Sequence, residues 1–225
     1  MARKIKSLRR RLLIRLGHEM NLDHYPWGTK SDSDKADKFR RMFRRVHDIF
    51  EEEGAANVEW VFCPMRRGTS NSLPFSAYYP GDAYADWLGL DGYNWAGARN
   101  RPWRSFEEIF KSSMIEMSKL CPSKFVIICE YGSDDRGGDK GAWLAGVLPT
   151  CKTAAFSQLK ALVYFNNIQD GAQWRVDYPY SALDDYRTLV QDPCTCRPRC
   201  LRLGKQLSYS RVATSKERSA GDWLR

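Results

Sequence analysis

Two glutamates of this 225-residue chain lie at positions where a carboxylate could act in catalysis. Glu19 follows the apolar run 12–16, and Glu130 follows the apolar run 125–129. A carboxylate at the end of a strand is costly to bury unless it is paired or used. Two of them on different strands suit hydrolysis of a glycosidic bond, with one as protonated acid and the other as ionised nucleophile. Taken alone the pair is weak evidence, because many strand-end carboxylates are only solvated or paired with arginine.

The elements that must position these glutamates alternate along the chain. Apolar runs predict strands, and apolar residues three and four positions apart or capping signals predict the helices between them. Strands separated by helices pair in parallel through right-handed crossovers. Polar and aromatic residues gather after the strands, where the carboxyl ends of a barrel or an open α/β sheet bind ligands. The predicted strands are 12–17, 57–64, 85–93, 124–129 and 161–165, and the predicted helices are 33–53, 105–120, 139–148 and 180–190.

The charge distribution and the hydropathy of the sequence limit which kinds of binding partner are expected. The formal net charge of +9 comes from the two ends, because residues 1–16 hold seven basic residues and no acid, and 193–225 hold eight basic and two acidic residues. No nucleic-acid-binding motif accompanies these ends, so no nucleic-acid partner is expected. No apolar run approaches the roughly 18 residues that cross a bilayer, so no membrane partner is expected either.

The seven cysteines do not indicate a disulfide framework, because their number is odd and the chain is not small. Cys63 and Cys129 lie at the ends of apolar runs, where a thiol usually packs as a small hydrophobe. The cluster at 194–200 has three cysteines, no nearby histidine and no standard zinc spacing. We therefore predict neither a metal nor a cofactor, and we interpret 193–225 as an irregular tail.

Several segments resemble glycoside hydrolase family 26, a family of β-mannanases with some lichenases and β-1,3-xylanases. The sequence 18–21 (HEMN) followed by 25–27 (YPW) is similar to the family's acid/base segment. Further segments match in the same order, and together with the first they cover about residues 11–187. These segments are 57–64, 78–82 with 86–87, 91–95, 130–133, 140–143 and 165–166 with 174–175.

The resemblance implies a role for each matching residue. Glu19 would be the general acid/base and Glu130 the nucleophile of a retaining mechanism. Tyr93 would donate a hydrogen bond that keeps Glu130 ionised. The likeness also argues against a metal at His18, Glu19 and His24. The implied substrate-binding residues are His18, Asn21, Trp27, Tyr93, Trp95 and Trp174.

The resemblance also implies a fold that this chain contains only in part. The family fold is a (β/α)8 TIM barrel, in which the acid/base strand is the fourth of eight. Only about ten residues precede that strand here. We therefore expect an incomplete barrel with strands 4–8 present and strands 1–3 missing, which truncation of the gene model would explain. We divide the chain into a basic segment 1–10, a partial catalytic domain 11–192 and a basic, Cys-containing tail 193–225.

Two features of this interpretation bear on activity. His24 stands where the family usually has an aromatic residue that stacks on the sugar. A partial barrel would leave strand edges exposed, through which the chain could associate with another chain.

The predicted function is hydrolysis of mannan or galactomannan by an endo-β-1,4-mannanase-like enzyme, with the polysaccharide as partner. The alternatives are β-1,3-xylanase or lichenase activity, a catalytically inactive truncated paralogue, or a sugar-binding remnant. The family implies secretion, although no signal peptide is visible in this sequence.

Overall fold

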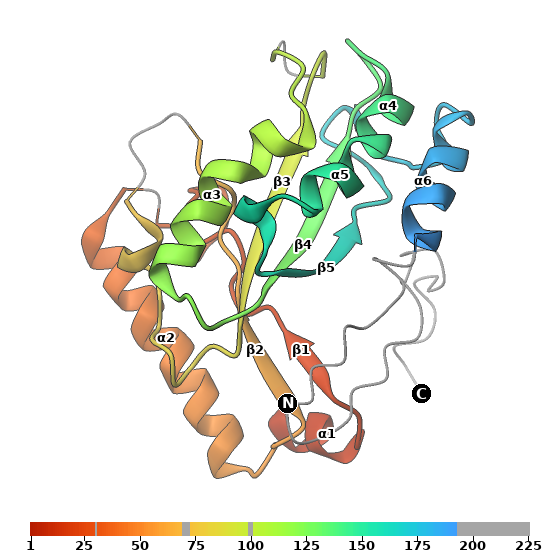
Figure 1. Cartoon of the computed structure of the whole chain (residues 1–225). Coiled ribbons are helices and arrows are strands. Elements are labelled where there is room, and N and C mark those ends of the chain that lie inside the picture. Colours follow the sequence, from red (N-terminus) through yellow and green to blue (C-terminus); the bar gives the residue numbers. More distant parts are fainter. Residues whose placement is uncertain (30, 69–72, 99–100, 193–225) are drawn as a thin grey trace. The chain divides into compact units, whose positions relative to one another are not determined.

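The computed structural model describes residues 1–29, 31–68, 73–98 and 101–192. Five strands form a parallel sheet whose order, β1-β2-β3-β4-β5, follows the chain (Figure 1). This arrangement confirms the five predicted strands and the α/β class. The strands are β1 (Leu12–Ile14), β2 (Val58–Phe62), β3 (Trp87–Asn94), β4 (Val126–Ser133) and β5 (Leu159–Tyr164), and a two-stranded sheet joins β6 (Ile168–Gln169) to β7 (Ala172–Gln173).

Helices separate the strands of the parallel sheet, as the sequence predicts. The chain divides into two compact units, of which the first comprises Met1–Gly92, Phe110–Cys129 and Gln158–Lys160, and the second comprises the rest. The helices are α1 (Ala2–Ser7), α2 (Ser33–Glu52), α3 (Phe106–Leu120), α4 (Lys140–Ala145), α5 (Val147–Cys151) and α6 (Ala182–Gln191), with 3-10 turns at Phe75–Ala77 and Ala154–Phe156.

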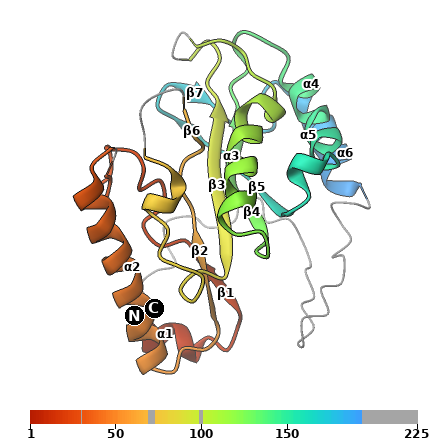
Figure 2. The same cartoon turned by 60° about the vertical axis from the view of Figure 1, so that its left-hand side comes forward.

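In the first unit, α2 lies beside β2 (Figure 2), and its apolar side chains pack against that strand. Phe43 and Phe50 contact the ring of Trp60 edge-on, at centroid distances of 5.9 and 5.0 Å. The helix begins one residue after Asp32, whose carboxylate accepts from the amide of Lys35 at 3.0 Å. The N-cap is therefore Asp32, because its backbone is extended while its side chain reaches the first turn.

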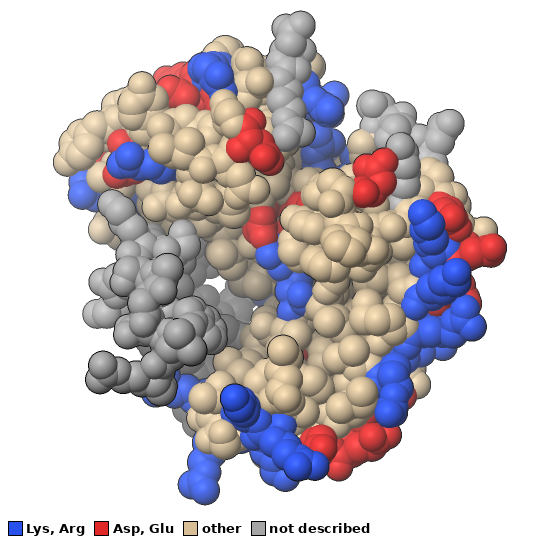
Figure 3. Space-filling view, turned by 180° about the vertical axis from the view of Figure 1, so that it is seen from behind, with Lys and Arg blue, Asp and Glu red and all other residues tan. Residues whose placement is uncertain are grey.

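The basic segment 1–10 contains a helix, α1, that the sequence analysis did not predict. Arg3 forms an ion pair with Glu53 at 2.7 Å, and the Asn57 amide donates to the carbonyls of Ile5 and Arg10 at 2.9 Å. Lys and Arg side chains gather around α1 and along α2 (Figure 3). Much of the N-terminal charge thus lies on the surface of the first unit.

In the second unit, the predicted helix 139–148 is two short helices, α4 and α5, which meet at Gly146. The buried Lys140 donates to the carbonyls of Gln173, Arg175 and Tyr178 at 2.8, 3.1 and 2.6 Å. Burial lowers the pKa of Lys140 to about 8. This side chain therefore fixes the segment that carries Trp174.

The two strands next to the glutamates end at positions other than predicted. β1 stops at Ile14, because Gly17 and Glu19 both adopt φ of +56°, in the left-handed region. β4 continues to Ser133, because its ladder persists: Phe165 donates from its amide to the Tyr131 carbonyl at 2.9 Å. The prediction that β4 ends at Glu130 is wrong, and Glu130 lies inside the strand.

Candidate active site

Glu19 lies in the turn that follows β1, in the first unit. Its amide donates to the carbonyl of Cys63 at 2.8 Å, and its carbonyl accepts from the amide of Leu22 at 3.0 Å. The residue is 5% exposed, and its carboxylate lies 3.3 Å from Nε2 of His24. The left-handed backbone of a glutamate is uncommon and has an energetic cost, and such conformations cluster at functional sites. His24, the departure from the family pattern, is thus the basic group next to this carboxylate.

An aromatic group flanks Glu19 within the same turn. Tyr25 and Trp27 stack with centroids 4.8 Å apart and planes 5° apart. The hydroxyl of Tyr25 lies 3.1 Å from Nε2 of His18, and the Trp27 indole donates to the His18 carbonyl at 2.8 Å. Trp27 is 37% exposed, which leaves part of its ring open to a ligand. Tyr25 belongs to the motif at 25–27, but no role was predicted for it from the sequence.

Asn21 fixes this turn to the segment that follows β2. Its amide nitrogen donates to the carbonyl of Met65, and its amide oxygen accepts from the amide of Met65, both at 2.8 Å. The side chain therefore pairs with backbone as a neighbouring strand would. Asn21 is 5% exposed. Its proposed contact with substrate stays a prediction, and its contacts within the chain are structural.

Asp91 is fully buried and forms an ion pair with Arg15. Nη1 of Arg15 lies 2.7 and 2.8 Å from the two carboxylate oxygens of Asp91. Cys63 and Cys129 lie beside this pair, and the ligand atoms of the three residues are all within 4.8 Å of one another. These residues are the donor set within the first unit whose chemistry would suit a metal ion.

Glu130 lies on β4, in the second unit. The hydroxyl of Tyr93, on β3, donates to its carboxylate, as the resemblance implies. Tyr93 also packs against Trp174 and Trp95, whose rings meet edge-on at 4.7 Å. Trp174 is 1% exposed, whereas Trp95 is partly exposed. In this unit Tyr93, Trp95, Glu130 and Trp174 thus form one cluster, and Trp95 offers more of its ring to a ligand than Trp174.

Asp134 closes β4 and connects it to the segment that carries Trp174. Its carboxylate accepts from the Arg136 guanidinium at 2.8 and 2.9 Å and from the amide of Gln173 at 2.9 Å. Burial raises the pKa of Asp134, but these hydrogen bonds outweigh burial and hold it below its usual value. The sequence carried no signal for this role beyond the position of Asp134 after an apolar strand.

Comparison with known proteins identifies the family. The sequence model described as "Glycosyl hydrolase family 26" matches residues 1–127, and the chain belongs to this family. The match includes Glu19 and ends before Glu130. Endoglucanase H of Acetivibrio thermocellus is 31% identical over 194 residues, which are 84% of this chain and 21% of that relative. A mannan endo-1,4-beta-mannosidase of Bacillus subtilis is 29% identical over 36% of this chain and 23% of that relative.

Solved structures show the same fold. The catalytic domain of a GH26 endo-beta-1,4-mannanase from Bacillus sp. JAMB-750 matches with a TM-score of 0.63 at 22% identity, over 81% of this chain and 50% of that one. An endo-beta-1,4-mannanase double mutant from Cellulomonas fimi matches with a TM-score of 0.64 at 21% identity, over 82% and 41%. The chain thus spans half or less of these proteins, and its fold is an incomplete (β/α)8 barrel, as predicted.

The remaining sequence predictions concern the C-terminal tail, the cysteines and the absence of a membrane-spanning segment. The tail 193–225, with its three cysteines, lies outside the described residues. The cysteines inside the described ranges, Cys63, Cys121, Cys129 and Cys151, carry free thiols. Within those ranges no helix has both the length and the apolar character needed to cross a membrane.

Proposed function

We propose that this chain is a retaining glycosidase of the endo-β-1,4-mannanase type, with Glu19 as general acid/base and Glu130 as nucleophile. The hydrogen bond from Tyr93 to Glu130 is the observation that carries the proposal. A hydroxyl donor stabilises the ionised carboxylate, which is the form that attacks a sugar. Glu19, by contrast, is almost fully buried beside an exposed histidine. Two carboxylates in such different surroundings suit the two different roles.

The reaction would proceed in two displacements. A carboxylate oxygen of Glu130 attacks the anomeric carbon while the bond to the leaving oxygen breaks, and Glu19 gives its proton to that oxygen. In the second step Glu19 takes a proton from water, whose oxygen attacks the same carbon and releases Glu130. This mechanism requires carboxyl groups about 5–5.5 Å apart.

The aromatic side chains would hold the polysaccharide. Trp27 and Trp95 retain exposed ring surface, and sugar rings stack on such faces. His18, Asn21, Tyr93 and Trp174 complete the proposed binding set. Mannan or galactomannan is the first candidate substrate, because the solved neighbours are titled as mannanases. A glucan is the second, because the relative that matches over 84% of this chain is named an endoglucanase.

The first experiment measures reducing-sugar release from galactomannan and from a soluble β-glucan by the purified chain. Glu130→Ala should abolish release from both polysaccharides. Glu19→Ala should abolish release from polysaccharide but keep activity on an aryl glycoside whose leaving group needs no proton. Glu51→Gln on the exposed face of α2 is the matched control and should behave as the unchanged chain.

The outcomes separate this proposal from its alternatives. Equal loss on the aryl glycoside in both variants would contradict the assignment of Glu19 as acid/base. A folded chain without hydrolysis that still binds mannohexaose would be a sugar-binding remnant, and one that neither hydrolyses nor binds would be an inactive paralogue. Activity only on β-glucan or a β-1,3-xylan would replace mannan as the substrate.

A further inference from the structure

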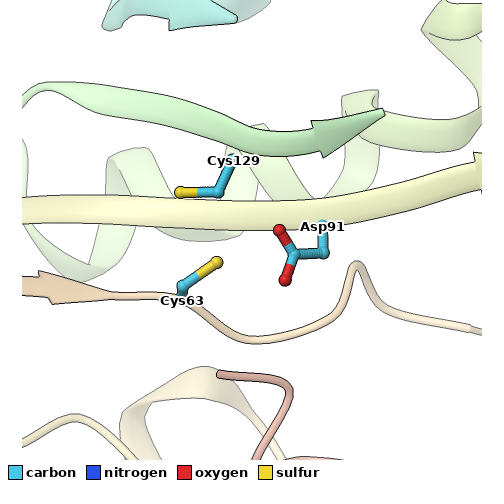
Figure 4. A group of neighbouring side chains, drawn as sticks. All are labelled: Cys63, Asp91 and Cys129. Carbon is cyan, nitrogen blue, oxygen red and sulfur yellow. The ribbon is translucent and has the colours of Figure 1, made fainter. Parts of the chain in front are cut away.

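We propose that Cys63, Asp91 and Cys129 form a site for a thiophilic divalent cation, of which zinc and cadmium are the chemical type. The side chains come from the end of β2, from β3 and from β4, all within the first unit (Figure 4). Their sulfur and carboxylate oxygen atoms all lie within 4.8 Å of one another. This proposal does not depend on glycosidase activity.

The distances between the two sulfur atoms and the carboxylate oxygen are close to those expected around a single metal ion. Zinc bonds to sulfur are about 2.3 Å long and those to carboxylate oxygen about 2.0–2.2 Å, so two ligands of one tetrahedral ion lie roughly 3.6–3.8 Å apart. Only small movements would bring the three atoms around a single ion. With three protein ligands, water would take the fourth position of a tetrahedral site.

A disulfide between the two cysteines does not fit the same geometry. Cys63 follows β2 and Cys129 lies on β4, and β3 separates these strands in the sheet. Neighbouring strands are about 4.7–4.9 Å apart, so the two backbones are roughly 9–10 Å apart. A disulfide requires Cα atoms within about 6.8 Å. The thiols can therefore meet across β3 but cannot be joined to each other.

Gly89 on β3 makes this meeting of the thiols sterically feasible. A Cβ atom at position 89 would lie 2.8 Å from Cβ and 3.0 Å from Sγ of Cys63, which no ordinary contact allows. The Cys63 side chain thus occupies space over β3 that any larger residue would fill. Val61 and Trp87 pack beside it, and Phe125, Ile127 and Cys129 pack against this cluster. Apolar surroundings of this kind exclude water and strengthen bonds between a cation and thiolates.

Charge balance favours an ion at this place. Asp91 is 0% exposed and its negative charge is balanced by Arg15. A divalent cation that displaces one proton from each thiol adds two positive and two negative charges, so the buried group stays neutral. A carboxylate has about four lone-pair sites, so the pair with Arg15 is compatible with a metal bond.

The test is a cadmium titration of the reduced full-length chain, followed by thiolate-to-metal absorption in the ultraviolet and by calorimetry. Cys194, Cys196 and Cys200 are first changed to serine, so that thiols outside the described residues do not contribute. We expect one ion per chain and the release of two protons. Because loss of an outer-shell partner already costs roughly 10- to 100-fold, Cys129→Ser should weaken binding by about 100-fold or more. Cys151→Ser, at a partly buried thiol on α5, should leave binding unchanged.

A second measurement needs no change at the site itself. Bound cadmium should protect the partly exposed Cys129 from alkylation, as mapped by mass spectrometry, and should leave the alkylation rate of Cys151, which is also partly exposed, unchanged. Equal protection of Cys151, unchanged affinity in Cys129→Ser, or a folded chain that binds no cadmium would each overturn the proposal.

Discussion

The two candidate catalytic glutamates are positioned by different kinds of structure. Glu19 lies in a turn with a left-handed backbone, and that turn is held by side-chain hydrogen bonds, above all those of Asn21 to Met65. Glu130 lies inside a regular strand, where the register of β4 sets its direction and Tyr93 holds its carboxylate. The position of Glu19 therefore depends on a few specific side chains, whereas that of Glu130 depends on the sheet.

This difference separates the effects of substitution. In the turn around Glu19, the side chain of Asn21 makes the hydrogen bonds to backbone that a neighbouring strand makes elsewhere in the sheet. Loss of this side chain should therefore destabilise the turn. Around Glu130, the backbone should persist when one side chain is lost, and the effect of Tyr93 should fall on the hydrogen bond that the carboxylate accepts. Stability should thus respond more strongly to a single side chain in the first region than in the second.

The largest effect is expected for Asn21→Ala. The change leaves the partly buried N–H and C=O of Met65 without their partner, at about 1–3 kcal/mol for each group. We expect the free energy of unfolding to fall by about 3 kcal/mol in urea titrations, together with loss of hydrolysis. Asn167→Ala, at an exposed turn, is the control and should cost well under 1 kcal/mol. Equal stability of the two variants would show that the turn does not depend on Asn21.

The next effect is expected for Asp134→Asn in the second region. At neutral pH the variant loses an ion pair whose arginine is half exposed, so we expect a loss of about 2 kcal/mol. Because the pKa of Asp134 is lowered in the folded chain, its stabilisation is complete above the unfolded pKa of about 3.9 and is lost as the pH falls through the folded pKa. The difference between the two proteins should therefore shrink in acid.

Asp184→Asn is the control for this pH dependence, since Asp184 forms a comparable ion pair with Arg187 on the surface of α6. Its effect should be within about 0.5 kcal/mol at every pH. A difference between the unchanged chain and Asp134→Asn that stays constant from neutral pH into acid would contradict the role assigned to the Asp134 charge.

More of the fold than of the site could be predicted from the sequence, because most helices and strands depend on local sequence patterns. Periodic apolar residues determine α2, and the capping box of Ser105 and Glu108 opens α3 as expected, with the Glu108 carboxylate 2.7 Å from the Ser105 amide. The end of β4 was missed because Glu130 interrupts an apolar run without interrupting its hydrogen-bonded ladder. Helix α1 was missed because contacts with residues about 50 positions away, such as Glu53, hold it.

The sequence predicted which residues belong to the candidate site better than it predicted how they contact one another. The resemblance indicated the glutamates and the hydrogen bond from Tyr93, because these belong to continuous motifs. It did not indicate that the Asn21 amide pairs with Met65 or that His24 lies against Glu19, because these contacts depend on the path of the turn. The cluster of Cys63, Asp91 and Cys129 also escaped, since its members are on three separate elements.

A smaller effect is expected for Tyr93→Phe, which removes only the hydroxyl that donates to Glu130. The ring should keep its contacts with Trp95 and Trp174, so stability should change little. We expect kcat to fall by about tenfold, which corresponds to about 1.4 kcal/mol of transition-state stabilisation. Tyr186→Phe, which removes a buried hydroxyl on α6, should leave kcat unchanged. A full loss of stability in Tyr93→Phe would show that this region, too, depends on single side chains.

The smallest effect is expected for Trp27→Ala, at the exposed edge of the first region. Trp27 stacks on Tyr25 and is 37% exposed, so its loss removes one face for a sugar ring and one exposed hydrogen bond, to the His18 carbonyl. We expect KM for polysaccharide to rise roughly fivefold, about 1 kcal/mol, with kcat nearly constant. Tyr180→Ala removes an aromatic ring that is 70% exposed outside the proposed site, and should change neither constant. A fall in kcat without a change in KM would instead mean that Trp27 positions Glu19 through the turn, so that even the exposed part of this region is structural.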